Sequence, residues 1–448
     1  MNLTQDMTKG NPLRIIIKFG IPLLIGNMLQ QVYNMVDSII VGKGISVDAL
    51  AAVGSTGSIN FLVLGFVIGL TQGVTILVAQ YFGAKDITRL RKSITMSAYL
   101  TISLGVLVTI FSCIFAKDLL VFMNTPNNIL DNATKYIRII FVGTLITFAF
   151  NFFSGILRAV GDSKSPLIAM IISFFVNVVL DVLFVISFDM GVAGAAYATV
   201  IAQVVSAGYC YYRVSNIEEL KIKREDWKYD HSLFKKTFKL SLPVALMNAV
   251  TAVGVMVLQY FVNGYGSLYV AGYTAGSKIV ILLEQISNTF GFAIATFVGQ
   301  NLGANKIKRI KEGVNKTAVF IIVINIIVAI LMFIFGKSIL SLMIDKEEIE
   351  VIKVAYNYLV ITSLFLWTLG LLFVYRCSLQ SMGDTLIPMI SGIIEFFARI
   401  IAIIVLPSIF GFNGVAFSEA AAWVGATILL AGACYYRIHK YQNTIEQV

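Results

Sequence analysis

Two carboxylates inside apolar stretches are the residues of this sequence best suited to chemistry. Asp37 follows "QQVYNMV", and Asp181 interrupts "FFVNVVLDVLFVI" (residues 174–186) four residues after Asn177. At the centre of a bilayer, an ionised aspartate costs about 2.5 to 3.5 kcal/mol. The carboxylate avoids that cost by pairing with a base, by holding a cation or by taking up a proton. Because no Lys or Arg lies in the middle of these stretches, we expect Asp37 and Asp181 to exchange a proton or a small cation.

Polar residues at helical spacing accompany both carboxylates. Residues three, four and seven apart share one face of a helix, and four apolar stretches carry such a polar face. The four faces are Asn27, Gln30, Gln31, Asn34 and Asp37; Thr147, Asn151, Ser154 and Arg158; Ser173, Asn177 and Asp181; and Thr199, Gln203 and Ser206. Since a polar face cannot meet lipid cheaply, we expect all four to point inward.

The predicted cation site combines the two carboxylates with neutral oxygen donors. Its members are Asp37, Asp181, Asn177, Asn151 and Thr199. Carboxylate, amide and hydroxyl oxygens suit a hard cation, here Na⁺ at Asp37 and Asp181, and we expect no other metal. For the neutral residues the alternative is that they only hydrogen-bond between helices.

Charged residues also interrupt later apolar stretches. Glu395 and Arg399 are four residues apart, and Glu419 is placed to meet Arg399 from the next helix. These three either form a structural ion network or take part in substrate binding or gating. Glu284 has no cation at helical spacing, so it either attracts a cationic substrate or is protonated or paired elsewhere. The predicted residues of a substrate cleft are Asn34, Gln30, Glu284 and Tyr33.

The composition indicates which elements position these residues. The chain has 448 residues, of which 58% are hydrophobic and 13% charged, whereas soluble domains are about one quarter charged. Stretches long enough to cross a hydrocarbon core of about 30 Å recur throughout. We predict an all-α membrane protein with twelve transmembrane helices, at 13–40, 50–81, 93–115, 133–160, 165–187, 191–213, 237–263, 269–300, 315–336, 352–380, 386–410 and 413–438.

The net charge of +10 records topology rather than nucleic-acid binding. Lys and Arg gather in the segments on the side of the N-terminus, for example at 85–92, 213–239 and 306–316, and are few on the opposite side. This asymmetry is the positive-inside rule, and it predicts that both termini are cytoplasmic. We therefore expect a multi-pass protein of the plasma membrane.

The two halves of the chain are similar at an offset near 220 residues. "VAQYFGAKD" (78–86) matches "VGQNLGANK" (298–306), and "ILRAVGDSKSP" (156–166) matches "SLQSMGDTLIP" (378–388). Such a repeat indicates a duplicated architecture, and six helices per half relate the halves by a pseudo-two-fold axis along the membrane normal. We expect two pseudo-symmetric six-helix lobes around a central cleft.

The predicted domains follow from this repeat. They are a cytoplasmic tail (1–12), an N-terminal lobe (13–213), a charged cytoplasmic linker (214–236), a C-terminal lobe (237–440) and a second tail (441–448). The linker could lie on the membrane surface, with Trp227 and Phe234 on its apolar side. The second lobe does not copy the carboxylates, because Asp37 corresponds to Leu258 and Asp181 to Ile403.

Gly-Asp pairs mark the same turn in both halves. Gly161 and Asp162, and Gly383 and Asp384, each stand shortly before a proline. Because Gly adopts positive φ and Pro favours a helix start, we predict cytoplasmic turns between the fourth and fifth helix of each lobe. Their role is either structural only or includes gating.

Several motifs together resemble the multidrug and toxic compound extrusion (MATE) family. They are "QQVYNMVDSIIVG", "ALAAVGSTGSI", "GVTILVAQYFGAKD", "GILRAVGDSKSP" and "NVVLDVLF", and the resemblance covers residues 12–437. It implies the MATE fold, alternating access, and export of organic compounds in exchange for Na⁺ or H⁺. In the DinF-type branch the cation site looks like Asp37, Asn177, Asp181, Asn151 and Thr199 here. Acidic residues of the second lobe serve other branches, and Glu284 is not an assured match to them.

We therefore predict a secondary active multidrug exporter and not an enzyme. Its substrates would be cationic or amphipathic aromatic molecules, with no cofactor beyond the coupling ion, no nucleic-acid partner and a monomeric state in the bilayer. One alternative is a lipid-linked saccharide flippase of the same superfamily. Another is an integral membrane transferase, which is disfavoured because the chain has two His and no acidic metal motif.

Overall fold

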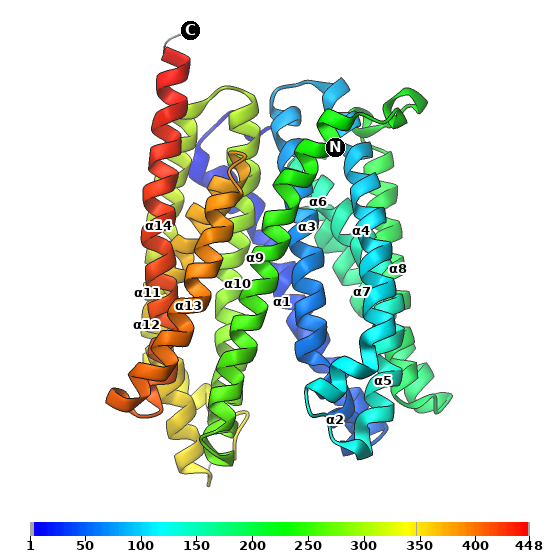
Figure 1. Cartoon of the computed structure of the whole chain (residues 1–448), viewed down its shortest axis with the longest axis vertical. Helices are drawn as coiled ribbons and strands as arrows, with labels where there is room; N and C mark the ends of the chain where they lie inside the picture. Colours follow the sequence, from blue (N-terminus) through cyan, green and yellow to red (C-terminus); the bar gives the residue numbers. More distant parts are fainter. Residues whose placement is uncertain (1–3, 346, 447–448) are drawn as a thin grey trace. The chain divides into compact units, whose positions relative to one another are not determined.

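A computed structural model describes residues 4–345 and 347–446, which form helices and connecting turns with no strand among them (Figure 1). The first half contains α1 (Pro12–Gly44), α2 (Val47–Ser55), α3 (Gly57–Gly83), α4 (Ile87–Phe122), α5 (Asn127–Val142), α6 (Thr144–Ala159), α7 (Lys164–Asp181), the π-helical segment η1 (Val182–Ser187) and α8 (Gly191–Ser215). The short 3₁₀ turns η2 (Glu218–Leu220) and η3 (Arg224–Trp227) follow. The second half contains α9 (His231–Asn263), α10 (Ser267–Gly303), α11 (Ile307–Leu340), α12 (Ile349–Ser381), α13 (Leu386–Phe410) and α14 (Asn413–Glu446).

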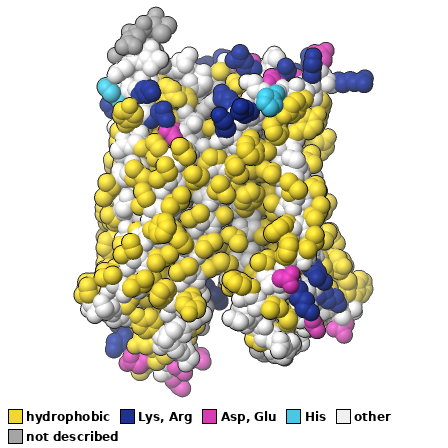
Figure 2. Space-filling view, in the orientation of Figure 1, with side chains coloured by type: hydrophobic (Ala, Val, Ile, Leu, Met, Phe, Trp, Pro, Cys, Tyr) yellow, Lys and Arg dark blue, Asp and Glu magenta, His cyan; other side chains and the backbone are white. Residues whose placement is uncertain are grey.

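The helices have the length and composition of membrane spans. Within the described ranges, eleven are long and apolar enough to cross a bilayer, and α5 with α6 makes a twelfth when the bent pair is counted as one span. The predicted all-α fold with twelve spans is confirmed. Large hydrophobic side chains are exposed along α4 and α11, and Figure 2 shows hydrophobic side chains on the helix flanks with Lys and Arg at the helix ends. An exposed apolar surface of this extent indicates that these helices contact the lipid of a membrane.

The chain divides into two compact units. The first contains Ile21–Ala249 and the described residues before Met7, and the second contains Met7–Gly20 and the chain from Val250 onward. Helix α1 therefore begins in the second unit and ends in the first, whereas α9 begins in the first and ends in the second. The division differs from the predicted lobes at the first helix of each repeat, and the lobe boundaries stay a prediction.

In the first unit, α3 packs on the first part of α9 through glycines. A Cβ atom on Gly73 would lie 2.3 Å from Ser241 Cα, and one on Gly69 would lie 2.7 Å from Ala245 Cα. Asn248 Nδ2 donates to the Gly65 carbonyl at 3.2 Å. Small residues at this spacing let two helix backbones approach closely in a membrane, so this part of α9 is fixed to α3.

The repeated Gly-Asp turns have the same backbone in both units. Gly161 has φ +88° and Gly383 has φ +87°, a region that favours glycine. The amide of the following Asp162 donates to Leu157, and that of Asp384 donates to Leu379. The predicted turns are thus confirmed as turns, and their role in gating stays a prediction.

Each of these turns is also bonded to the last helix of its repeat, α8 in the first and α14 in the second. Arg213 Nε on α8 donates to Ser165 Oγ at 3.0 Å, and Ser165 Oγ donates to Asp162. In the second unit Arg437 on α14 forms an ion pair with Asp384 directly. The repeated "CYYR" sequence ends in these two arginines, which accounts for its presence in both halves.

The linker between α8 and α9 packs on α4. Thr95 Oγ1 donates to the Asp226 carbonyl at 2.6 Å, and the Tyr99 and Trp227 rings meet edge to face at 5.7 Å. Trp227 stays 44% exposed, while Phe234 packs against buried residues of the first unit. The exposed indole is compatible with the predicted place of the linker at a membrane surface.

Candidate functional site

The first unit holds a cluster of buried carboxylates. Asp37 on α1 is 8% exposed, and Asn177 and Asp181 on α7 are fully buried. The Asp37 and Asp181 carboxyl groups lie close enough to interact with each other. Five side-chain atoms of these three residues have no hydrogen-bond partner among the described residues. They are Asp37 Oδ1, both carboxylate oxygens of Asp181, and Asn177 Oδ1 and Nδ2.

Such unpaired atoms are unusual inside a protein. More than about 90% of buried polar groups are hydrogen-bonded, and each unpaired group costs about 1 to 3 kcal/mol, with more for a charged one. Four of the five atoms are oxygens, which are the ligands of hard cations and the acceptors of a proton. The residues therefore fit a bound Na⁺ or a shared proton.

Irregular helices surround this cluster. Asp181 is the last α-helical residue of α7, and the π-helical segment η1 begins directly after it. Helices α5 and α6 meet at Gly143 with a bend of 43°. Single π-turns and broken membrane helices occur mostly at functional sites, where they turn side chains and backbone groups towards a ligand.

The other predicted members of the cation site lie on α6 and α8. Asn151 Nδ2 donates to the Thr147 carbonyl at 2.9 Å, and Thr147 Oγ1 donates to Gln203 Oε1 at 2.5 Å. Thr199 Oγ1 donates to the Ala195 carbonyl at 3.0 Å and also lies beside the Tyr33 hydroxyl. Both Asn151 and Thr199 are half-buried, so they are less enclosed than the two aspartates.

A cavity of about 130 Å³ lies in the first unit where the four predicted polar faces meet. Its lining consists of Leu29, Gln30, Tyr33, Leu64, Ile68, Thr147, Phe150, Asn151, Met170, Ser173, Phe174, Gln203 and Ser206. The inward direction of the polar faces is thereby confirmed for these residues. Drug-sized ligands occupy roughly 300 to 1,000 Å³, whereas a water takes roughly 30 Å³. The cavity in this state suits a few waters or a hydrated ion rather than a whole drug molecule.

One neighbour of the aspartates was missed by sequence reasoning. Tyr136 on α5 is 8% exposed and lies within electrostatic range of Asp37, Asp181 and Tyr33. In an apolar stretch a tyrosine usually packs in the core. However, Tyr136 precedes Thr147 by eleven residues, or about three helical turns, which places both on one face. That spacing could have revealed it.

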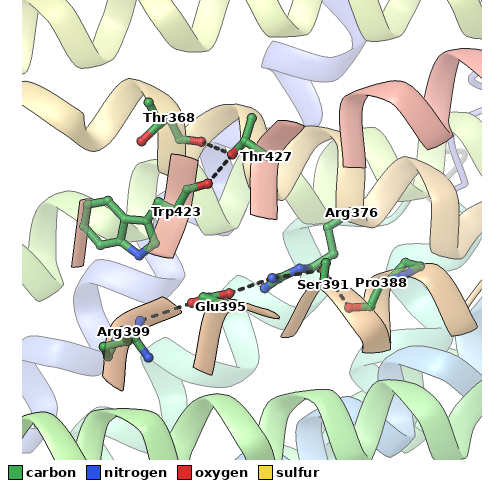
Figure 3. Close-up of polar contacts among 8 residues, drawn as sticks. All are labelled: Thr368, Arg376, Pro388, Ser391, Glu395, Arg399, Trp423 and Thr427. Atoms are coloured by element: carbon green, nitrogen blue, oxygen red, sulfur yellow. Dashed lines mark hydrogen bonds and ion pairs between the residues drawn. The ribbon is translucent and has the colours of Figure 1, made fainter. Parts of the chain in front are cut away.

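The second unit contains a buried ion network in which both oxygens of one carboxylate are paired (Figure 3). Glu395 on α13 accepts from Arg376 Nη2 at 2.8 Å and from Arg399 Nη2 at 3.2 Å. Arg376 Nη2 also lies 3.5 Å from Ser391 Oγ. All three charged side chains are at most 6% exposed, and one carboxylate is shared by two buried guanidinium groups.

Two details of this network correct the sequence-based prediction. Glu419 was expected to meet Arg399, but its Oε1 instead accepts from the Tyr358 hydroxyl at 3.0 Å, and no ion pair joins Glu419 to Arg399 among the described residues. Arg376, which the predicted network did not include, is 5% exposed and pairs with Glu395. The buried carboxylate attracts Arg376 inward because an unpaired Glu395 would be costly.

The predicted substrate-cleft residues fall into separate places. Gln30 and Tyr33 line the cavity of the first unit, and Asn34 on the same helix does not; Gln30 and Asn34 are both exposed, and Tyr33 is half-buried. Glu284 belongs to the second unit, where it is half-buried and within electrostatic range of Glu419, Arg399 and Glu395. No hydrogen bond or ion pair joins Glu284 to another described residue. The structure brings Gln30 and Tyr33 together and leaves Glu284 in a different environment.

Twelve spans, a duplicated helical architecture and unpaired carboxylates inside one repeat define a multi-pass membrane transporter. The MatE family model matches the chain twice, over residues 22–183 and 243–405, which are the two halves of the repeat. The chain therefore belongs to the MatE family, whose members are transporters of small molecules and not enzymes.

Relatives named as multidrug resistance or multidrug export proteins match most of the chain. The probable multidrug resistance protein YoeA of Bacillus subtilis is 29% identical over 87% of this chain and 86% of its own length. The probable multidrug resistance protein NorM of Thermotoga maritima is 26% identical over 92% and 88%. The multidrug export protein MepA of Staphylococcus aureus is 23% identical over 90% and 89%.

Solved structures share the fold at low identity. The crystal structure of MATE in complex with MaL6 has a TM-score of 0.90 and 22% identity, over 98% of this chain and 99% of that one. An outward-facing multidrug resistance MATE family transporter of the MOP superfamily has a TM-score of 0.89 over 99% of both chains, also at 22% identity. These two similarities support the fold.

Proposed function

We propose that this protein is a secondary active exporter of organic compounds, driven by inward flow of H⁺ or Na⁺ through Asp37 and Asp181. The observation that carries this proposal is the set of four buried oxygens without partners on Asp37, Asp181 and Asn177. Because several relatives are named multidrug resistance or export proteins, the proposed substrates are varied cationic or amphipathic aromatic molecules. The protein would act in the plasma membrane as a monomer, with both termini in the cytoplasm.

The two aspartates supply the coupling step. Two ionised carboxylates in a low-dielectric site repel each other strongly, so the pair favours holding one cation or one proton between them. Binding that ion draws α1 towards α7, and its release lets the two helices separate. The site thereby has two arrangements, and an ion gradient shifts the balance between them.

The link to the substrate runs along α1. Tyr33 and Gln30, which line the cavity, stand one and two turns before Asp37 on the same helix. A shift of α1 on ion binding therefore changes the cavity at the same time. In this proposal the bound ion and the exported compound compete through the position of α1, which gives exchange rather than leak.

The second unit supports this assignment by contrast. The positive charges of Arg376 and Arg399 are shared with Glu395, so they do not form a basic surface of the kind that a lipid-linked pyrophosphate needs. This disfavours the saccharide flippase. Glu284 remains a candidate for contact with a cationic substrate. Membership of the DinF-type branch is also part of the proposal, on the same residues.

The test is efflux of a fluorescent cationic dye from proteoliposomes under separately imposed Na⁺ and pH gradients. Wild type should export the dye with one of these gradients and lose export when that gradient is collapsed. Asp37→Asn and Asp181→Asn should each reduce gradient-driven efflux to the level of empty liposomes. Asp131→Asn, at an exposed position of α5 in the same unit, is the matched control and should keep wild-type efflux.

Two results would contradict the proposal. Undiminished efflux by Asp181→Asn would show that the carboxylate does not carry the coupling ion. Dye efflux by wild type that is independent of both gradients would show that the protein is not a secondary exporter of this kind. The two gradient arms also separate Na⁺ from H⁺ coupling.

A further inference from the structure

The fourth membrane span is broken in the first repeat and continuous in the second. Helices α5 and α6 meet at Gly143 with a bend of 43°, whereas the corresponding α12 runs unbroken from Ile349 to Ser381. The α12 sequence contains no glycine before Gly370. The break is therefore a property of the repeat that carries the unpaired carboxylates.

Gly143 allows an unusually close contact with α8. A Cβ atom built on Gly143 would lie 2.6 Å from Val200 Cγ2 and 3.2 Å from Val200 Cγ1. Real Cβ contacts are longer than this, so any larger residue must displace Val200. A valine in a helix is held in one preferred rotamer, so its side chain cannot turn away cheaply. A side chain at position 143 would thus push α8 itself away from the break.

This contact lies next to residues of the candidate cation site. Val200 directly follows Thr199, whose side chain lies beside the Tyr33 hydroxyl on α1. One helical turn further along the same seam, Thr147 Oγ1 donates to Gln203 Oε1 at 2.5 Å. On the other side of the break, Tyr136 lies within electrostatic range of both aspartates.

We propose that Gly143 is a positioning residue of the coupling-ion site: the break that it permits seats α8 against the fourth span and so sets Thr199 and Tyr136 around Asp37 and Asp181. This inference rests on the proposed ion-coupled function. Gly143 itself does not touch the ion. It acts through Val200, and its replacement alters the affinity of the site for the ion rather than the carboxylates that bind it.

The second repeat shows what the same seam does without a glycine. At the offset of 222 that relates Tyr136 to Tyr358, Gly143 corresponds to the much larger Phe365. The seam there holds Tyr358 and Glu419 in a hydrogen bond. The unit with the glycine is the one whose buried carboxylate oxygens are unpaired.

The test measures ion affinity in four purified variants. They are Gly143→Ala, Val200→Ala, the double variant with both changes, and Gly208→Ala, a control on α8 where an added Cβ meets nothing within 4 Å. The probe is Na⁺ at fixed pH and, separately, H⁺ in the absence of Na⁺, with the shift in thermal unfolding midpoint as readout. Binding of a fluorescent cationic dye is measured in parallel.

Gly143→Ala should weaken the response to the coupling ion roughly tenfold, as overpacking of a tight contact does, while dye binding changes little. The double variant should recover most of the wild-type ion response, because Val200→Ala removes the two side-chain atoms that the new methyl group meets and leaves only the Ile140 carbonyl oxygen at 3.2 Å. Gly208→Ala should respond nearly as wild type does, and Val200→Ala alone should be impaired less than Gly143→Ala.

Each other outcome overturns the inference. Wild-type ion affinity in Gly143→Ala would show that the contact does not position the site. A double variant as impaired as the single one would show that Val200 is not the reason for the glycine. If Gly143→Ala does not accumulate, the double variant alone decides, since it must fold and bind the ion. Asp181→Asn distinguishes the two proposals. If Asp181→Asn responds to the ion as wild type does, the ion-coupled function itself is wrong. If it loses the response while Gly143→Ala keeps it, only the role of Gly143 is wrong.

Discussion

The two repeats use buried charge in opposite ways. In the first unit Asp37 and Asp181 are buried with carboxyl oxygens that have no partner among the described residues. In the second, Glu395 bonds two arginines and Glu419 bonds Tyr358. One unit leaves its negative charge available to an ion from outside the protein, and the other satisfies it internally.

The backbone shows the same contrast. The first unit has a 43° break at Gly143 and a π-helical segment after Asp181, while the corresponding α12 and α13 are continuous. Tyr136 and Tyr358, related by an offset of 222, stand at matching positions in both. Duplication thus kept the tyrosine and the turns, and the break at Gly143 and the π-helical segment accompany the unit whose buried carboxylate oxygens are unpaired. The second unit balances its buried carboxylate with arginines of its own, whereas the unpaired carboxylates of the first unit are the basis of the proposed ion exchange.

The largest expected effect of a single change is at Glu395. Glu395→Gln leaves Arg376 and Arg399 buried without a carboxylate, and breaking a buried ion pair in this way costs about 3 to 5 kcal/mol. We expect a large fall in the thermal unfolding midpoint in detergent and poor accumulation in the membrane. Glu312→Gln, which removes one partner of the exposed pair with Lys316, is the matched control and should not change the midpoint measurably.

The reverse result would break the comparison. If Glu395→Gln unfolds at the wild-type midpoint, the network in the second unit is not structural, and its alternative role in substrate binding or gating gains weight. Dye efflux measured on the same preparation would then show whether transport is lost without loss of stability.

The second effect in size is stabilisation by the coupling ion. A ligand at 100 times its dissociation constant stabilises the folded state by about 2.7 kcal/mol. We expect this stabilisation in wild type, as a higher unfolding midpoint in saturating Na⁺ or at lower pH, and its loss in Asp181→Asn. Without ions Asp181→Asn should be as stable as wild type or more so, because it removes an unpaired buried charge.

Glu284→Gln is the matched change in the second unit for this experiment. It should keep the ion-dependent shift, because Glu284 lies outside the carboxylate cluster. If Glu284→Gln abolishes the shift and Asp181→Asn does not, the roles of the two units have been assigned the wrong way round.

The features that were predictable from sequence follow periodicity and repetition. Twelve spans, the Gly-Asp turns and the inward polar faces were visible because helical spacing and the offset near 220 are properties of the chain itself. The break at Gly143 was missed because glycines are common in membrane helices, and the apolar stretch 133–160 has a second one at Gly155. Arg376 and Tyr358 as partners were missed because which helices meet across a unit is decided by packing, which spacing within one helix does not reveal.

A smaller effect is expected where α3 meets α9. Gly73→Ala places a Cβ 2.3 Å from Ser241 Cα, and because backbone atoms cannot yield as side chains do, we expect a cost of about 1 to 3 kcal/mol. The corresponding residue of the second repeat is already alanine, Ala293. Gly57→Ala on the same α3, where nothing lies within 4 Å, is the control. Equal unfolding midpoints for the two variants would show that the close approach does not hold α9 to the first unit.

The smallest expected effect separates the two Gly-Asp turns. Asp384 pairs with Arg437, whose side chain is 31% exposed, while Asp162 is bonded by Ser165 and by the amides of Lys164 and Ser165. Asn keeps the oxygen that accepts from the amides and loses only the acceptor of the neutral Ser165 hydroxyl, so Asp162→Asn should cost less than the loss of the ion pair at Asp384. Asp384→Asn removes a partly exposed ion pair and should cost about 1 kcal/mol or less.

A double-mutant cycle decides whether that pair is the cause. Asp384→Asn, Arg437→Gln and the double variant are compared by unfolding midpoint, and the two single losses should not add, because each removes the same interaction. Strictly additive losses would mean that Asp384 stabilises its turn only through the amide of Ile387. In that case the two turns are equivalent, and the contrast between the units is confined to the interior of the membrane.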